Sequence, residues 1–83
     1  MSISDRWTEH EDSLSTELEC GDFMTAVDLI NQIANLAESH NHHPDICLRS
    51  YSKLEIKLQT HDSGGLSSKD EKLAVAIDGL LDE

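Results

Sequence analysis

Histidine is the residue type best suited to chemistry in this chain, and four of the five histidines fall in two places. His40, His42 and His43 lie close together, and His61 lies further along the chain. An imidazole with an ordinary pKa of about 6.5 can give or take a proton near neutral pH. Two imidazoles in one pocket could run a reaction that needs one proton donor, one acceptor and no nucleophile. We therefore expect the two histidine segments to meet.

The sequence offers no convincing nucleophile. Cys20 and Cys47 each lie in an apolar, strand-like run, so we expect two reduced and largely buried thiols. Two cysteines are too few for a disulfide framework in a chain of 83 residues, and they form no Cys-x-x-Cys motif. No serine stands beside a histidine in a recognisable nucleophile elbow.

A zinc site is the alternative use of the histidines, because zinc accepts imidazole ligands readily. Such a site would combine His40, His42, His43 and His61. Closely spaced histidines at a helix end rarely converge on one ion, so the sequence favours proton transfer and we expect no metal.

The first histidine cluster follows a predicted helix. Apolar residues recur at steps of three and four over residues 23–39, which is typical of a helix with a broad buried stripe. Asp22 is a good N-cap, Asn41 can adopt the left-handed conformation that ends a helix, and Pro44 cannot continue it. Gly21 and Asp22 also end a preceding strand, residues 14–20, in which polar and apolar side chains alternate.

Further strands and a second helix are predicted on either side. Trp7 opens a short strand-like segment, and residues 48–60 alternate as one long strand with a bend near residues 50–52. Ser63-Gly64-Gly65 is a predicted loop. Ser67-x-x-Asp70 resembles a capping box that begins a last helix with a stripe of leucine, isoleucine and alanine.

These elements predict one α+β domain over residues 1–83. An antiparallel sheet of three to four strands would carry two helices on one face. A domain this small buries little apolar surface, so association with copies of itself would help it.

The charge is strongly acidic, with 17 Asp and Glu against 6 Lys and Arg and a net charge of -11. Nucleic acids and anionic membranes attract positive charge, so neither is an expected partner. Acidic charge favours solubility, and it also occurs in proteins adapted to high salt. Because no signal peptide or membrane-spanning apolar run is visible, we expect a cytoplasmic protein.

The motif spacing resembles the signature of the pterin-4a-carbinolamine dehydratase family. It reads Glu38-Ser-His-Asn-His42-His43-Pro44, then six residues, Tyr51, nine residues, His61, eight residues and Asp70. Asp22-Phe23-x-x-Ala26 resembles the start of the family's long helix, and Gly64-Gly65-Leu66-Ser67 resembles the loop into its last helix. The resemblance covers about residues 7–81.

The resemblance implies dehydration of 4a-hydroxytetrahydropterin to quinonoid dihydropterin, which recycles the pterin cofactor of aromatic amino-acid hydroxylases. Pterin is then the substrate, and no cofactor is expected. His42 and His61 would transfer protons, and His43 would mainly hold the substrate. The other implied binding positions are Glu38, Asn41, Pro44, Gln59, Thr60, Asp62 and Asp70. Glu38, four residues before His42, could orient its ring, and Asp70 could do the same from the last helix.

Two departures from the family pattern accompany this resemblance. Family members usually carry another helix ahead of the first strand, which we expect to be missing here, and Ile46 stands where the family often has tryptophan. Relatives of this fold can also act without catalysis, as dimerisation or assembly modules. That is the alternative function, although an intact histidine set favours catalysis. The family's pairing of sheets and helices implies a homodimer or a tetramer.

Overall fold

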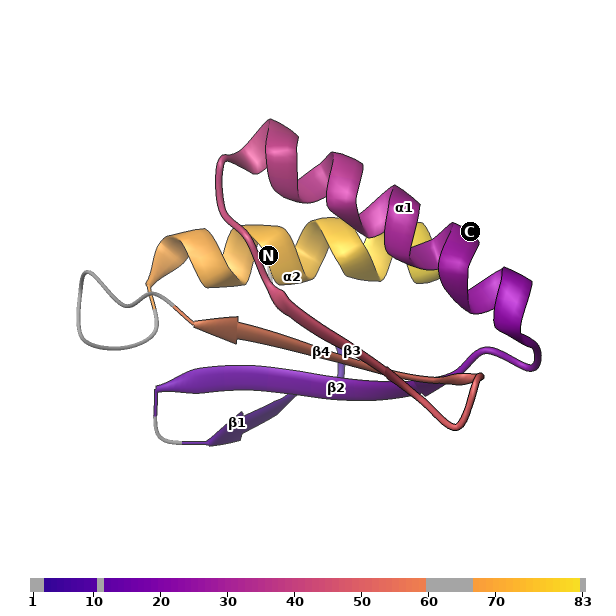
Figure 1. The fold of residues 1–83 in the computed structure, drawn as a ribbon. Coiled ribbons are helices and arrows are strands. Elements are labelled where there is room, and N and C mark those ends of the chain that lie inside the picture. Colours follow the sequence, from indigo (N-terminus) through magenta and orange to yellow (C-terminus); the bar gives the residue numbers. More distant parts are fainter. Residues whose placement is uncertain (1–2, 11, 60–66, 83) are drawn as a thin grey trace.

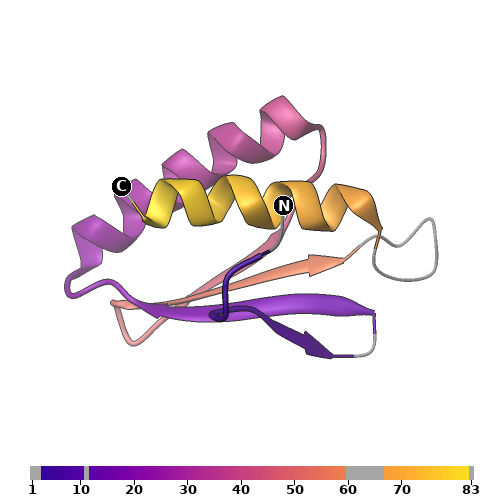
Figure 2. The same cartoon turned by 180° about the vertical axis from the view of Figure 1, so that it is seen from behind.

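A computed structural model describes residues 3–10, 12–59 and 67–82. Four strands form one antiparallel sheet in the order β1-β2-β4-β3, and two helices pack on one of its faces (Figures 1 and 2). The elements follow the chain as β1 (Thr8–His10), β2 (Ser13–Glu19), α1 (Phe23–His40), β3 (Asp45–Arg49), β4 (Lys53–Gln59) and α2 (Ser68–Leu81). The predicted α+β arrangement is confirmed. Residues 3–7 lead into β1 without forming a helix.

The prediction of one long strand over residues 48–60 is wrong, because the chain reverses there into a β3–β4 hairpin. Ser50 and Tyr51 both have positive φ, at 49° and 56°, and they turn the chain back. Leu48 then pairs with Leu54, so the aliphatic residues of both strands still share one face. A strand and a hairpin have the same alternating pattern, and here no glycine or asparagine marked the turn.

Helix α1 has the predicted caps. The Asp22 carboxylate accepts the N–H of Thr25 at 2.7 Å, and Asn41 ends the helix with φ of 51°. The face toward the core is narrower than the sequence pattern suggested. Ala26, Ile33 and Ala37 are buried, but Phe23 is 52% exposed because it lies in the first turn, beyond the core.

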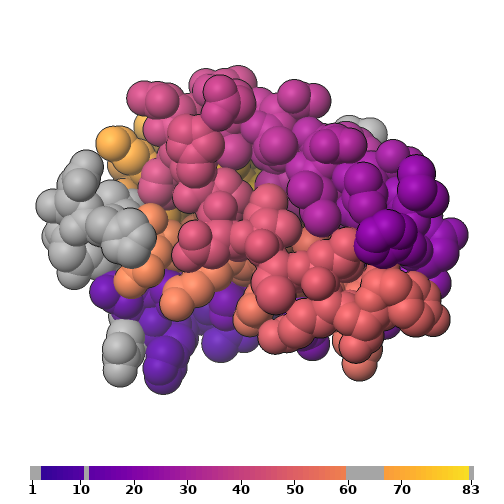
Figure 3. Space-filling model, viewed as in Figure 1, coloured from indigo at the N-terminus to yellow at the C-terminus, as the bar shows by residue number. Residues whose placement is uncertain are grey.

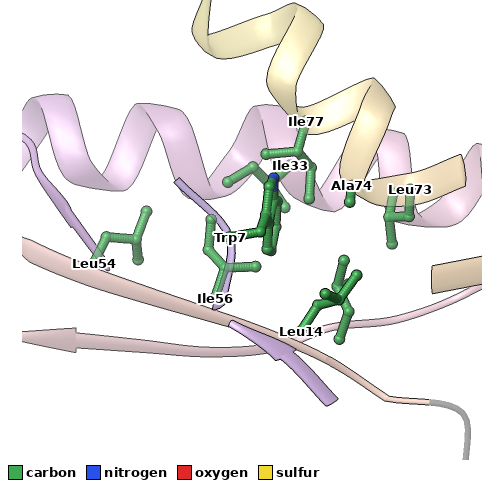
Figure 4. Close-up of a cluster of buried hydrophobic side chains, with 9 residues drawn as sticks. Trp7, Leu14, Ile33, Leu54, Ile56, Leu73, Ala74 and Ile77 are labelled. Atoms are coloured by element: carbon green, nitrogen blue, oxygen red, sulfur yellow. The ribbon is translucent and has the colours of Figure 1, made fainter. Parts of the chain in front are cut away.

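Helix α2 closes the core. Its Ser67 and Asp70 form the predicted capping box. Apolar side chains from α2, α1, two strands and the segment before β1 meet in one cluster (Figure 4). Its members are Trp7, Leu14, Ile33, Leu54, Ile56, Leu58, Leu73, Ala74 and Ile77.

Asp78 ties the amino-terminal segment to α2. Its carboxylate accepts the indole N–H of Trp7 at 2.9 Å, and also the backbone N–H and the hydroxyl of Ser4 at 2.9 and 3.0 Å. Arg6 lies 3.4 Å from the same carboxylate. These bonds satisfy an indole N–H that would otherwise be buried without a partner.

The expectation of two buried thiols is wrong. Cys47 is exposed and Cys20 is half-buried, and both are free. Cys47 lies in the edge strand β3, opposite Glu55 of β4, on the side of the sheet that the helices do not cover. In the described ranges, no helix is long and apolar enough to cross a membrane.

We predict that Asp78→Ala lowers the free energy of unfolding by about 2–4 kcal/mol, because it leaves the buried indole donor of Trp7 and the part-buried donors of Ser4 without this acceptor. Urea denaturation followed by the fluorescence of Trp7, the one tryptophan of the chain, measures the loss. Asp82→Ala is the matched control. It removes the same charge but only an exposed ion pair with Arg6, which contributes under about 1 kcal/mol. Equal losses in both variants would contradict this account.

The Asp22 cap predicts a pH-dependent contribution to stability. The backbone N–H of Thr25 lowers the pKa of the Asp22 carboxyl below its ordinary value. The cap therefore contributes fully above the unfolded pKa of about 4, and the contribution is lost as the pH falls through the folded pKa. The stability difference between the native chain and Asp22→Ala should be constant above about pH 5 and shrink in acid. The side-chain amide of the Asp22→Asn variant cannot ionise, so the advantage of that variant over Asp22→Ala should not change with pH.

Candidate active site

His42 and Asp70 form the best-defined polar contact of the candidate site. Nε2 of His42 lies 2.6 Å from Oδ1 of Asp70. The Asp70 side chain is fully buried, and the His42 side chain is only 11% exposed. The left-handed turn at Asn41 takes the chain off the axis of α1, and the N–H of His42 then bonds the carbonyl of Ala37 at 3.1 Å.

The second carboxylate oxygen of Asp70 caps the start of α2. Its Oδ2 accepts the backbone N–H of Ser67 at 3.0 Å, as the third helical residue of the capping box. An ionised Asp70 accepts hydrogen bonds but donates none, so Nε2 of His42 carries a proton in this contact. Nδ1 of a neutral His42 ring then keeps its lone pair.

His43 has a separate, exposed partner. Its Nε2 lies 2.6 Å from Oε2 of Glu38, with side chains 60% and 76% exposed. The prediction that Glu38 orients His42 is therefore wrong. The four-residue spacing brings side chains together only along a continuous helix, and the left-handed Asn41 interrupts it. The predicted helix end at Asn41 was the sequence signal that Glu38 would not pair with His42.

The other predicted binding positions are placed only in part. Asn41 is the exposed C-cap of α1, Pro44 is half-buried before β3, and Gln59 ends β4 opposite Ser13. Thr60, His61 and Asp62 lie outside the described residues, as does the predicted loop 63–65. The carboxyl end of β4 lies at the same end of the molecule as the start of α2 and the end of α1 (Figures 1 and 2).

His40 lies apart from the His42–Asp70 contact. It is exposed on the last turn of α1 and lines a groove of about 500 Å³. The other groove residues lie on α2: Ser68, Glu71, Lys72, Val75 and Ala76. Sequence reasoning did not identify this groove. Over the part of the chain that the structure describes, no three His, Cys, Asp or Glu side chains are placed to hold a metal ion.

The described part of the site is thus an imidazole supported by a buried carboxylate. Such a pair can accept a proton at Nδ1 and hold the resulting positive charge against Asp70. It can also return that proton to a leaving group. Neither step requires a nucleophile.

Comparisons with known proteins identify a family for this chain. The family model described as Pterin 4 alpha carbinolamine dehydratase matches residues 1–80. A provisionally named pterin-4-alpha-carbinolamine dehydratase from Aquifex aeolicus is 39% identical over 77 residues, which cover 93% of this chain and 77% of that protein.

Two solved structures are similar in fold. The transcriptional coactivator/pterin dehydratase from Brucella melitensis superposes with a TM-score of 0.82 at 27% identity, over 90% of this chain and 81% of that one. A pterin dehydratase-like RuBisCO assembly factor of the alpha-carboxysome gives 0.69 at 20% identity, over 96% of this chain and 89% of its own. The second likeness shows the fold alone. With the family model matching nearly the whole sequence, this chain belongs to the pterin-4a-carbinolamine dehydratase family.

Proposed function

We propose that this chain catalyses the dehydration of 4a-hydroxytetrahydropterin to quinonoid dihydropterin by histidine acid–base catalysis. The contact between His42 and the buried Asp70 carries the proposal, because it joins a titratable ring to a carboxylate that can hold a positive charge on that ring. Family membership supplies the substrate class.

The reaction needs two proton transfers and no change of oxidation state. The N5–H bond of the pterin breaks, and its proton goes to a base on the protein. The electron pair left on N5 forms the N5–C4a double bond as the C4a–O bond breaks. The departing hydroxyl takes a proton from an acid and leaves as water, so the protein ends with the number of protons it had at the start.

We assign the base to His42 and the acid to His61, with His43 holding the substrate. Nδ1 of His42 would take the N5 proton while Asp70 stabilises the imidazolium that forms. The acid must act on the other side of the C4a–N5 bond, and His61 is the family position that supplies a second ring. His43 and Glu38, both exposed, suit a role in binding polar groups of the ring system.

The proposed function also implies a source for the substrate, a location and an assembly. A pterin-dependent aromatic hydroxylase forms the 4a-hydroxy compound, and the dehydratase returns the cofactor to use in the cytoplasm. A homodimer or tetramer is the proposed assembly, without nucleic acid or membrane as partner. A non-catalytic assembly role is the competing function, but such a role needs no complete set of the histidines that the family uses in proton transfer.

The first test is dehydration of freshly generated 4a-hydroxytetrahydropterin, followed by the absorbance of quinonoid dihydropterin. We expect the native protein to accelerate it, and His42→Ala and His61→Ala each to lower kcat/KM by about 10²–10³-fold. Gln32→Ala, at an exposed position in the middle of α1, is the control and should keep full activity. If the native protein does not accelerate the reaction, the assembly role becomes the better account.

A second test separates the support of His42 from the capping of α2. Asp70→Asn should lower kcat about 10–100-fold, since a neutral amide cannot hold the imidazolium. Ser67→Ala removes the side-chain cap but keeps the carboxylate and the Ser67 N–H. It should cost about 1 kcal/mol of stability and change kcat less than two-fold. If both variants lost the same activity, Asp70 would act only through the helix.

A further inference from the structure

Three large hydrophobic side chains are exposed in the described ranges, and all three lie at one end of the molecule. They are Phe23 at 52%, Met24 at 64% and Tyr51 at 66% exposed. The N–H of Cys20 bonds the carbonyl of Ser52 at 2.8 Å, which holds the start of α1 beside the β3–β4 hairpin. Figure 3 shows the purple start of α1 directly above the orange-red hairpin. We call Phe23, Met24 and Tyr51 the end patch.

The end patch is remote from the proposed active site. The patch adjoins the first turn of α1, and His42 follows the last turn of that helix. An α-helix of 18 residues is about 27 Å long. The end patch therefore does not belong to the pterin site.

Tyr51 is held in a conformation that a tyrosine adopts at a cost. Its φ of 56° lies in the left-handed region, which asparagine and glycine occupy far more readily. Burial of the ring does not offset this cost, because the side chain is 66% exposed. A role for the ring outside the fold would account for a tyrosine at this position.

The rim of the end patch is acidic. Glu19 and Asp22 flank it, each ahead of α1. A hydrogen bond from the Ser52 side chain lowers the pKa of Glu19, and the N–H of Thr25 lowers that of Asp22, so both are charged at neutral pH. Two cations also border the patch, since Arg49 pairs with Glu17 and Glu55, and Lys53 interacts with Glu19. With Asp22, the carboxylates at this end outnumber the cations by four to two.

We propose that the end patch docks an apolar segment of a partner protein that carries lysine or arginine beside its apolar residues. Phe23, Met24 and Tyr51 would supply the apolar contact, with the tyrosine as the aromatic anchor. Glu19 and Asp22 would select a cationic rim. A second copy of this chain fits this patch poorly, because a symmetric contact would bring Glu19 and Asp22 of both copies together.

The test uses three synthetic helical peptides in fluorescence anisotropy with the native chain. One has a leucine face flanked by lysines, the second has the same face flanked by glutamates, and the third has lysines with serines in place of leucines. The first should bind at least 10-fold tighter than the others, and weaken with added salt. The double variant Phe23→Ser/Tyr51→Asn should reduce its affinity at least 10-fold, whereas Val75→Ser in the α1–α2 groove should not. Equal binding of the first and third peptides, or no loss in the double variant, would overturn the proposal.

Two further readouts guard against a purely structural role. Tyr51→Asn relieves the left-handed strain, so its Tm should rise by several degrees. A lower Tm would mean that the ring stabilises the fold, and the proposal would fail. Light scattering of the double variant should give the native molar mass. A smaller mass would identify the end patch as a contact between copies and overturn the assignment to a cationic partner.

Discussion

The hydrogen bond between His42 and Asp70 is the interaction on which both the fold and the site depend. A carboxylate that is fully removed from water is costly unless donors surround it. Asp70 has donors from two sides, the ring of His42 and the backbone of Ser67. The same carboxylate therefore begins α2 and fixes the segment that follows α1, so the position of the imidazole is set by the requirement to satisfy a buried charge.

Helix α2 is anchored at both ends by carboxylates on its buried side. Asp70 joins its start to the end of α1, and Asp78 joins its last turns to Trp7 and Ser4. The apolar residues between them, Leu73, Ala74 and Ile77, provide burial, which is not directional. Hydrogen bonds have strict geometry, so the two carboxylates set the rotation and height of the helix over the sheet.

The fold alone does not select the function. A dehydratase-like RuBisCO assembly factor shares this architecture, as does a protein described as a coactivator and pterin dehydratase. What distinguishes a catalyst is a set of side chains with the right partners, because proton transfer depends on placement and charge at particular atoms. In the proposed mechanism, the partly buried His42 with the Asp70 carboxylate takes the proton, and the exposed His43–Glu38 pair holds the substrate.

The helix ends and the buried faces of the strands could be predicted from the sequence. Asp22, Asn41 and the Ser67–Asp70 box marked helix ends, because capping depends on neighbours within four residues. The alternation in β2 and β4 likewise identified which face each strand turns to the core. The β3–β4 hairpin could not be predicted, because Ser50 and Tyr51 form its turn with positive φ angles, which glycine and asparagine adopt more readily. The family resemblance already pointed to Asp70 as a partner of His42, and the structure confirms that contact. The partner of Glu38 and the exposure of Cys47 were decided only in three dimensions, because each depends on directions that the chain acquires on folding.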